Sequence, residues 1–190
     1  MKKELDLGKE KIGKLLLAFS VPCIISMIIN SIYNIVDQIF IGKGVGIIGN
    51  AATNVIFPIV IICNALAGLV GNGAAANLSL RLGEGKKDEA KKSIGSSITL
   101  LFIISILVVI LFELLLPNLV YVFGCTKNVY SSAMTYGRII VFGSFFMIVY
   151  SGLSQIIRAD GSPKYSMVCL LVGAILNIIL DPIFIFTFNM

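Results

Sequence analysis

Histidine is absent from this 190-residue sequence, and its four cysteines stand far apart without a Cys-x-x-Cys pair. The cysteines are Cys23, Cys63, Cys125 and Cys169. A zinc site built from cysteine and histidine ligands is therefore excluded, and so is an imidazole that acts as a general base. Carboxylates, amides and hydroxyls are the side chains left for any chemistry.

Charged residues are also scarce, at 13% of the chain against about 25% in a typical soluble domain. Hydrophobic residues reach 57% and the mean hydropathy is +0.99, so the composition indicates an integral membrane protein. The net charge of +5 comes from short basic clusters beside apolar segments, where membrane topology alone places such residues. We therefore expect a lipid bilayer around the chain and no nucleic-acid partner.

Long apolar runs fill most of the sequence. A membrane-spanning helix needs about 20 apolar residues, and the five segments that meet this length are 15–41, 51–79, 94–116, 132–157 and 166–188. The first run is too long for the apolar region of a signal peptide and lacks a cleavage site of small residues. The sequence thus predicts an all-α, multi-pass protein with one transmembrane domain over residues 1–190.

Lysine and arginine predict the orientation, because they are retained on the cytoplasmic side of a membrane. Basic residues cluster before the first segment, between the second and third, and between the fourth and fifth. The opposite loops contain only Lys43 and Lys127, with Arg138 near the outer end of the fourth segment. We expect a cytoplasmic N-terminus and, after five crossings, an extracellular end at Met190.

A polar stripe runs along the first segment, where steps of three or four residues connect Ser26, Asn30, Tyr33, Asn34 and Asp37. A charge at the bilayer centre costs at least about 2.5–3.5 kcal/mol, so such residues usually line a cavity or a relay. Asp37 is about 34 Å from Lys14 along a helix, which puts it in the outer half of the membrane. A carboxylate that reaches toward the outer water remains an alternative interpretation.

The fifth segment also has a polar face with a carboxylate, since Asn177 and Asp181 lie one turn apart on one side of the helix. Pro182 lacks an N–H group and interrupts the helix locally, which frees the carbonyl of Ile178. A carboxylate, an amide oxygen and a free carbonyl within one turn suit either Na⁺ or a proton. We interpret Glu113, which precedes Pro117, as an interfacial residue.

Enzyme motifs are missing. The run Gly44–Gly49 matches G-x-G-x-x-G but follows an apolar helix rather than a strand, and we interpret it as a flexible extracellular turn. The sequence also contains no G-x-S-x-G, H-E-x-x-H or P-loop pattern. We therefore expect that the protein is not an enzyme.

Four stretches stand out in order along the chain: VDQIFIGKGVG at 36–46, ANLSLRLGEGKKDEAKKSIG at 76–95, SQIIRADGSPKYSM at 154–167 and GAILNIILDPIFIF at 173–186. Together they resemble the multidrug and toxic-compound extrusion (MATE) family, in particular its MepA-like and DinF-like bacterial members. The resemblance implies a bacterial plasma-membrane antiporter in which two six-helix lobes export cationic amphipathic drugs. Uptake of Na⁺ or H⁺ would drive this export, and no other cofactor is implied.

The resemblance also implies site residues. The coupling cation, either a proton or Na⁺, would bind at Asp37 and Asp181, with an amide oxygen from Asn177 and a hydrogen bond from Tyr33. Polar and aromatic positions that could line the drug cavity are Asn30, Asn34, Phe146 and Tyr150, and packing explains the aromatic residues around Phe146 equally well.

The resemblance covers only the N-terminal lobe, because the sixth helix and the second lobe have no counterpart in these 190 residues. We expect a truncated or half-length chain that works with a C-terminal lobe or with a second polytopic chain. Two alternatives stay open: a flippase for lipid-linked oligosaccharide within the same superfamily, and a non-transporting membrane subunit that pairs with a longer partner.

Overall fold

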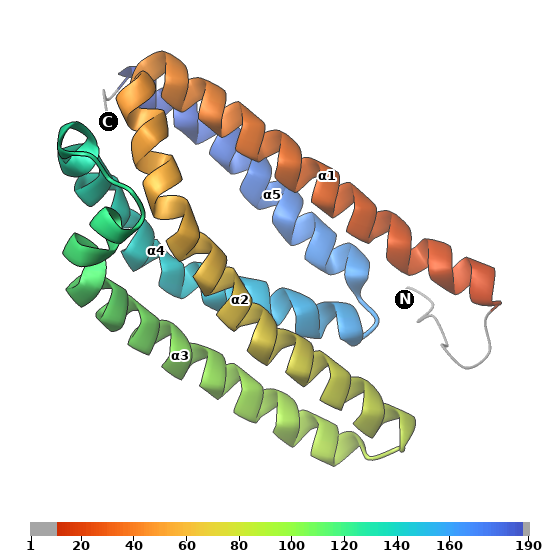
Figure 1. The fold of residues 1–190 in the computed structure, drawn as a ribbon. Coiled ribbons are helices and arrows are strands. Elements are labelled where there is room, and N and C mark those ends of the chain that lie inside the picture. Colours follow the sequence, from red (N-terminus) through yellow and green to blue (C-terminus); the bar gives the residue numbers. More distant parts are fainter. Residues whose placement is uncertain (1–10, 188–190) are drawn as a thin grey trace.

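The computed structural model describes residues 11–187 and consists of long helices (Figure 1). These are α1 (Ile12–Gly44), α2 (Ile47–Gly83), α3 (Lys87–Val122), α4 (Lys127–Ala159) and α5 (Pro163–Pro182), followed by the π-helix η1 (Ile183–Thr187). Each of the five long helices is long and apolar enough to cross a membrane, so the all-α, multi-pass fold is confirmed. The last predicted span ended at residue 188, which lies outside the described residues.

The connection between α1 and α2 is shorter than the sequence predicted. Only Val45 and Gly46 lie between the two helices, and Gly46 has a φ of +80°, which favours glycine. The expected flexible turn over residues 44–49 is therefore wrong. Most of that run is helical, and the two helices are joined by a tight, defined turn.

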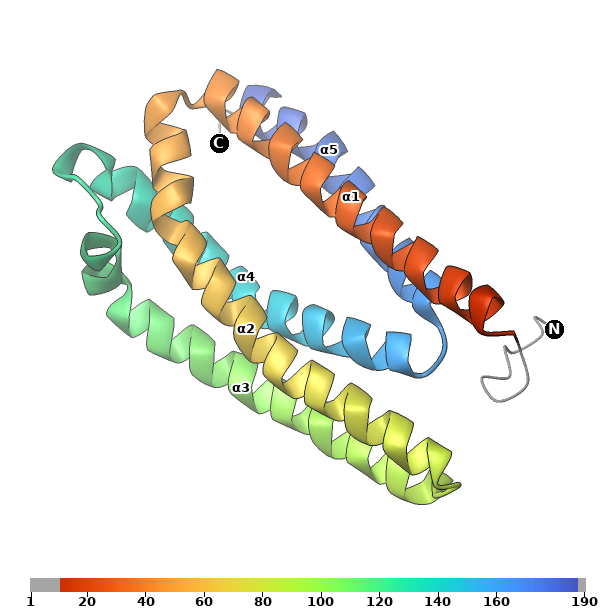
Figure 2. The same ribbon diagram turned by 45° about the vertical axis from the view of Figure 1, so that its right-hand side comes forward.

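The helices form two groups, visible in both ribbon views (Figures 1 and 2). Helices α2, α3 and α4 pack against one another, whereas α1 and α5 run side by side as a separate pair. The fully buried large side chains belong to the first group: Ile56, Ile59, Leu78, Leu101, Leu116, Val120, Val141 and Ile148. The α1–α5 pair buries far less of its surface, since Pro22 and Ser26 are the only buried residues of α1 in the part of the chain described.

Polar contacts connect the two groups at opposite ends of the described helices. At one end, Thr53 Oγ1 of α2 donates a hydrogen bond to Gln38 Oε1 of α1 over 3.4 Å. At the other, the buried hydroxyls of Ser154 in α4 and Ser166 in α5 lie 2.6 Å apart, and Arg158 Nε donates to Ser166 Oγ over 3.1 Å. The α1–α5 pair is thus joined to α2–α4 mainly near its ends.

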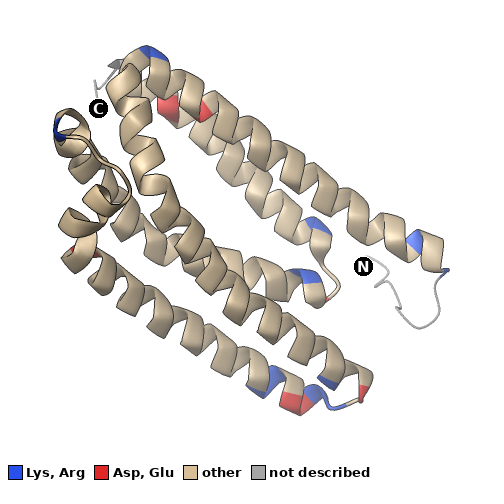
Figure 3. Cartoon of the chain, in the orientation of Figure 1, with Lys and Arg blue, Asp and Glu red and all other residues tan. Residues whose placement is uncertain are grey.

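Most basic residues lie at one end of the helices (Figure 3). The turn from α2 to α3, the turn from α4 to α5 and the start of α1 all lie at this end. The described basic residues at this end include Lys14, Arg81, Lys86, Arg158 and Lys164, whereas Lys2, Lys3 and Lys9 lie outside the described residues. This distribution is the one that the predicted cytoplasmic orientation requires.

Close backbone contact joins α2 to α4 at a pair of glycines. A Cβ atom added to Gly71 would lie 2.9 Å from both Cα and O of Gly152, closer than packed atoms allow. A Cβ atom added to Gly73, two residues further along α2, would meet nothing within 4 Å. Small residues at helix contacts allow this approach in membranes, and Gly71 has this packing role in α2.

Gly71→Ala should therefore lower the free energy of unfolding by about 1–3 kcal/mol, because the added methyl group must push two backbones apart. Gly73→Ala is the matched control and should leave stability unchanged or slightly higher, because alanine favours helix. Thermal unfolding in detergent measures both. Equal melting temperatures for the two variants would contradict the close contact.

Candidate functional site

The polar residues predicted on α1 and α5 meet near one end of the helix pair. Asn177 Nδ2 donates a hydrogen bond of 3.0 Å to Asp181 Oδ1 within α5. Asp37 of α1 lies close enough to Asp181 for their charges to interact, and acidic residues mark the two helices side by side in Figure 3. The structure thus brings together three of the four residues predicted to hold the coupling cation.

Two oxygen atoms of this group lack hydrogen-bond donors. Asn177 Oδ1 and Asp181 Oδ2 are buried and have no hydrogen-bond partner within residues 11–187. Buried acceptors are normally satisfied, so an unsatisfied pair beside a second carboxylate needs an explanation. A bound proton or a hard cation that prefers oxygen ligands would satisfy them. We refer to Asp37, Asn177 and Asp181 as the carboxylate cluster.

The backbone changes next to this cluster. Asn177 and Asp181 share one face of α5 because they are four residues apart. Pro182, directly after Asp181, is the last residue of the α-helix, and the chain continues as η1. The α-helix therefore ends where the sequence predicted an interruption, and the free carbonyl of Ile178 stays a prediction. A π-helical turn is uncommon and occurs frequently at functional sites.

Tyr136 of α4 is a further member of this region that the sequence analysis missed. It is half-buried and lies close enough to both Asp37 and Asp181 for electrostatic interaction. Its contact with the cluster depends on how α4 packs against α1 and α5. The only sequence signal was a hydroxyl within an apolar run, which is too common to identify a site.

Tyr33 occupies a different place from the one expected of a ligand. It is half-buried one turn from Asp37, and no hydrogen bond joins it to either carboxylate in the described structure. Its electrostatic neighbour is Tyr150 of α4. The hydrogen bond from Tyr33 to the coupling site thus stays a prediction.

The predicted cavity-lining residues lie on different faces. Asn34 Nδ2 donates to Asn30 O over 2.7 Å and to Asn30 Oδ1 over 2.8 Å, and both side chains are exposed on α1. Phe146 instead lines an apolar groove between α3 and α4. Tyr150 is the aromatic residue of α4 that approaches α1. Within the described residues, these four side chains do not line one common cavity.

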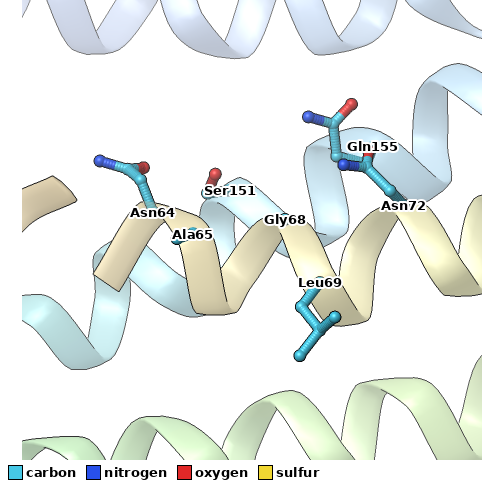
Figure 4. Close-up of a pocket in the computed structure, with 7 residues that line it drawn as sticks. All are labelled: Asn64, Ala65, Gly68, Leu69, Asn72, Ser151 and Gln155. Carbon is cyan, nitrogen blue, oxygen red and sulfur yellow. The ribbon is translucent and has the colours of Figure 1, made fainter. Parts of the chain in front are cut away.

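An amide-rich pocket of about 690 Å³ lies between α2 and α4 (Figure 4). Its lining residues are Asn64, Ala65, Gly68, Leu69, Asn72, Ser151 and Gln155. The figure shows Asn64, Asn72, Ser151 and Gln155 pointing to the same side, while Leu69 points the other way. Asn64 Nδ2 donates to the carbonyl of Val60 over 3.1 Å. We call this feature the amide pocket.

The sequence analysis also missed the amide pocket, although a signal was present. Asn64, Gly68 and Asn72 are spaced by four residues and therefore share one face of α2. Polar residues at this depth are costly against lipid and usually face a cavity. The spacing of these residues on α2 is therefore the sequence signal for this half of the pocket.

A known protein family matches most of the chain. The MatE family model matches residues 22–183, which include all five long helices in whole or in part. The chain belongs to the MATE family. The resemblance found in the sequence is thereby confirmed, and this family consists of transporters rather than enzymes.

Curated MATE relatives are considerably longer. The chain is 32% identical over 187 residues to the multidrug export protein MepA of Staphylococcus aureus, a match that covers 96% of this chain and 40% of MepA. It is 22% identical over 178 residues to the probable multidrug resistance protein YoeA of Bacillus subtilis, over 94% of this chain and 38% of YoeA. The chain thus spans about 40% of the length of these MATE proteins.

Solved MATE structures superpose on the whole chain. The structure of the MATE multidrug transporter DinF-BH gives a TM-score of 0.92 with 38% sequence identity and covers 100% of this chain and 43% of that transporter. An outward-facing MATE transporter of the MOP superfamily gives 0.92 with 27% identity, over 100% and 42% respectively. The two helix groups described above are thus part of a MATE fold.

Proposed function

We propose that this chain forms the first lobe of an antiporter that exports cationic amphipathic drugs and takes up Na⁺ or H⁺ in exchange. Because the chain spans about 40% of MepA, the proposal concerns it together with a second lobe, on the same polypeptide or on another. The observation that supports the proposal most directly is the carboxylate cluster, whose unsatisfied oxygens lie between two helices of a membrane domain.

The cluster favours uptake of one positive charge. Asp37 and Asp181 repel each other when both are ionised, and the repulsion is stronger in a low-dielectric surrounding than in water. A proton on one carboxylate, or Na⁺ between the oxygens of the three side chains, relieves this repulsion. Asn177 fits either ion, since its amide nitrogen already donates to Asp181 and its oxygen remains available as a ligand.

Cation binding can be transmitted through the α1–α5 pair. Drawing Asp37 toward Asp181 changes the packing of α1 on α5, next to the π-helical segment η1. The pair is attached to α2–α4 mainly by the contacts near its ends, Gln38 with Thr53 and Ser154 with Ser166. A shift of the pair would therefore alter the space beside the amide pocket, which links cation uptake to drug release.

The amide pocket is the part of this lobe best suited to contact a drug. Its polar groups are neutral, so they can accept hydrogen bonds from a cationic amphipath without holding it as tightly as a carboxylate would. No lysine or arginine is among its lining residues in the described chain. A flippase for lipid-linked oligosaccharide needs basic groups for pyrophosphate, and this pocket does not favour that alternative.

A dye-export assay tests the proposal. Bacterial cells that lack their own multidrug pumps express the protein, in the longest form that its source encodes. The cells are loaded with ethidium, and fluorescence follows the loss of the dye. We expect faster dye loss than in cells with the empty vector, and slower loss when the membrane gradients of H⁺ and Na⁺ are both collapsed. Dye loss at the vector rate would contradict the proposal, and dye loss that appears only with a second polytopic chain would favour the subunit alternative.

A further inference from the structure

An apolar groove of about 200 Å³ lies between α3 and α4, away from the carboxylate cluster. Its walls are Ile106, Val109 and Ile110 of α3 and Phe142, Phe145 and Phe146 of α4. Phe142 and Phe146 are 73% and 69% exposed, so the groove is open on this side. Phe145 makes edge-to-face contacts with Phe102 at 5.8 Å and with Phe146 at 5.1 Å, which fixes the aromatic wall.

An ion pair stands at one end of this groove. Arg138 Nε lies 3.5 Å from Glu113 Oε1, and the two side chains are 66% and 44% exposed. Arg138 precedes Phe142 by one turn of α4, and Glu113 follows Val109 by one turn of α3. Arginine has five N–H donors, and within residues 11–187 this single long contact is the only ion pair that Arg138 makes. Most of its donors are therefore available to a ligand.

The depth of Arg138 in the membrane matches that of a lipid phosphate. Arg138 precedes Arg158 by 20 residues in α4, which is about 30 Å of helix and equals the thickness of a hydrocarbon core. Lys92 and Glu113 are separated by a similar length of α3. With Arg158 and Lys92 at the basic end of the bundle, Arg138 and Glu113 lie at the opposite boundary of the membrane.

We propose that this groove, together with Arg138, binds one phospholipid of the outer leaflet. The acyl chain lies along Phe142 and Phe146 against Ile106 and Ile110, and the phosphate accepts hydrogen bonds from the guanidinium of Arg138. Guanidinium and phosphate form strong charge-assisted hydrogen bonds. Glu113 competes with the phosphate for Arg138 and repels the phosphate, so it limits the affinity. This site does not depend on which drug or coupling cation the protein uses.

Native mass spectrometry of the longest form of the protein, with phosphatidylglycerol titrated into detergent, measures the phosphate contact. We expect Arg138→Gln to weaken retention of one lipid at least about fivefold, which corresponds to about 1 kcal/mol. Lys127→Gln removes the same charge from the start of α4, away from the groove, and should change nothing. Glu113→Gln should strengthen retention, because it removes a negative charge beside the phosphate. Equal retention by wild type and Arg138→Gln, or weaker retention by Glu113→Gln, would overturn the proposal.

A tryptophan reporter tests the acyl chain. The chain contains no tryptophan, so Phe146→Trp adds a fluorophore in the groove, and Phe57→Trp adds one at another exposed apolar position. Phosphatidylglycerol with brominated acyl chains, at low mole fraction in detergent, should quench the Phe146→Trp protein more than the Phe57→Trp protein. Adding Arg138→Gln to both should abolish the difference. Equal quenching of the two reporter proteins, as expected if a protein segment fills the groove, would refute lipid binding there.

Discussion

Asp37→Asn should lower the initial rate of ethidium export by about tenfold or more, which corresponds to at least about 1.4 kcal/mol. Asparagine keeps the size of the side chain but removes the charge that attracts the coupling cation. The cluster would then hold one carboxylate, Asp181, whose hydrogen bond from Asn177 persists. Without the repulsion between two carboxylates, cation uptake no longer drives α1 toward α5. Dye loss from preloaded cells measures the rate.

Asp160→Asn is the matched control for this prediction. Asp160 is exposed in the turn after α4, at the basic end of the bundle, so the substitution removes the same charge outside the membrane-spanning segments. Export by this variant should equal that of the wild type. Immunoblotting of membranes shows whether the Asp37 variant is present at the wild-type level. Normal export by Asp37→Asn at equal abundance would remove Asp37 from the coupling site.

The sequence predicted those members of the site that stand out within a single helix. Asp37, Asn177 and Asp181 interrupt apolar runs, and Pro182 marks the end of the α-helix, so each gives a local signal. Tyr136 gives none, because its relevance comes from the packing of α4 near the α1–α5 pair. The amide pocket likewise combines residues of α2 with residues of α4. Periodicity places residues on a face and does not say which helix that face meets.

The helix ends were predicted less well than the spans, for a physical reason. Hydropathy detects the part of a helix inside the hydrocarbon, whereas backbone hydrogen bonds continue into water. Helix α3 begins at Lys87, well before the apolar run. Asp88 and Glu89 lie in its first turn, where negative charges interact favourably with the helix dipole and stabilise the helix. Arg81 at the end of α2 contacts Glu89 over 2.6 Å and adds an ion pair across the turn.

The separation of α1 and α5 from the other helices could not be read from the sequence either. All five segments are similarly apolar. In the most apolar 18-residue stretch of α2, however, 39% of the stretch is buried within the protein, against only 6% in α5. Much of the apolar surface on the α1–α5 pair is thus left for lipid or for further protein. These weakly covered helices are also the ones that carry the carboxylate cluster.

Asp181→Asn should reduce ethidium export as strongly as Asp37→Asn, and the double variant should be no worse than either single variant. One cation relieves the repulsion between the two carboxylates. Removing either charge abolishes this repulsion, so removing the second charge as well has no further effect on cation uptake. Residues that act as a unit show such non-additive effects. Initial rates of dye loss for the four proteins form the double-mutant cycle.

Two outcomes of this cycle would contradict a shared site. If each single variant lowered export about tenfold and the double variant about a hundredfold, the carboxylates would act independently. If Asp181→Asn exported normally while Asp37→Asn did not, the unsatisfied oxygen of Asp181 would have a structural role only. A double variant equal to the single ones would instead support one cation held between α1 and α5. Drug binding by the double variant should then no longer depend on pH or on Na⁺. Titrations of ethidium fluorescence with the purified proteins measure this dependence.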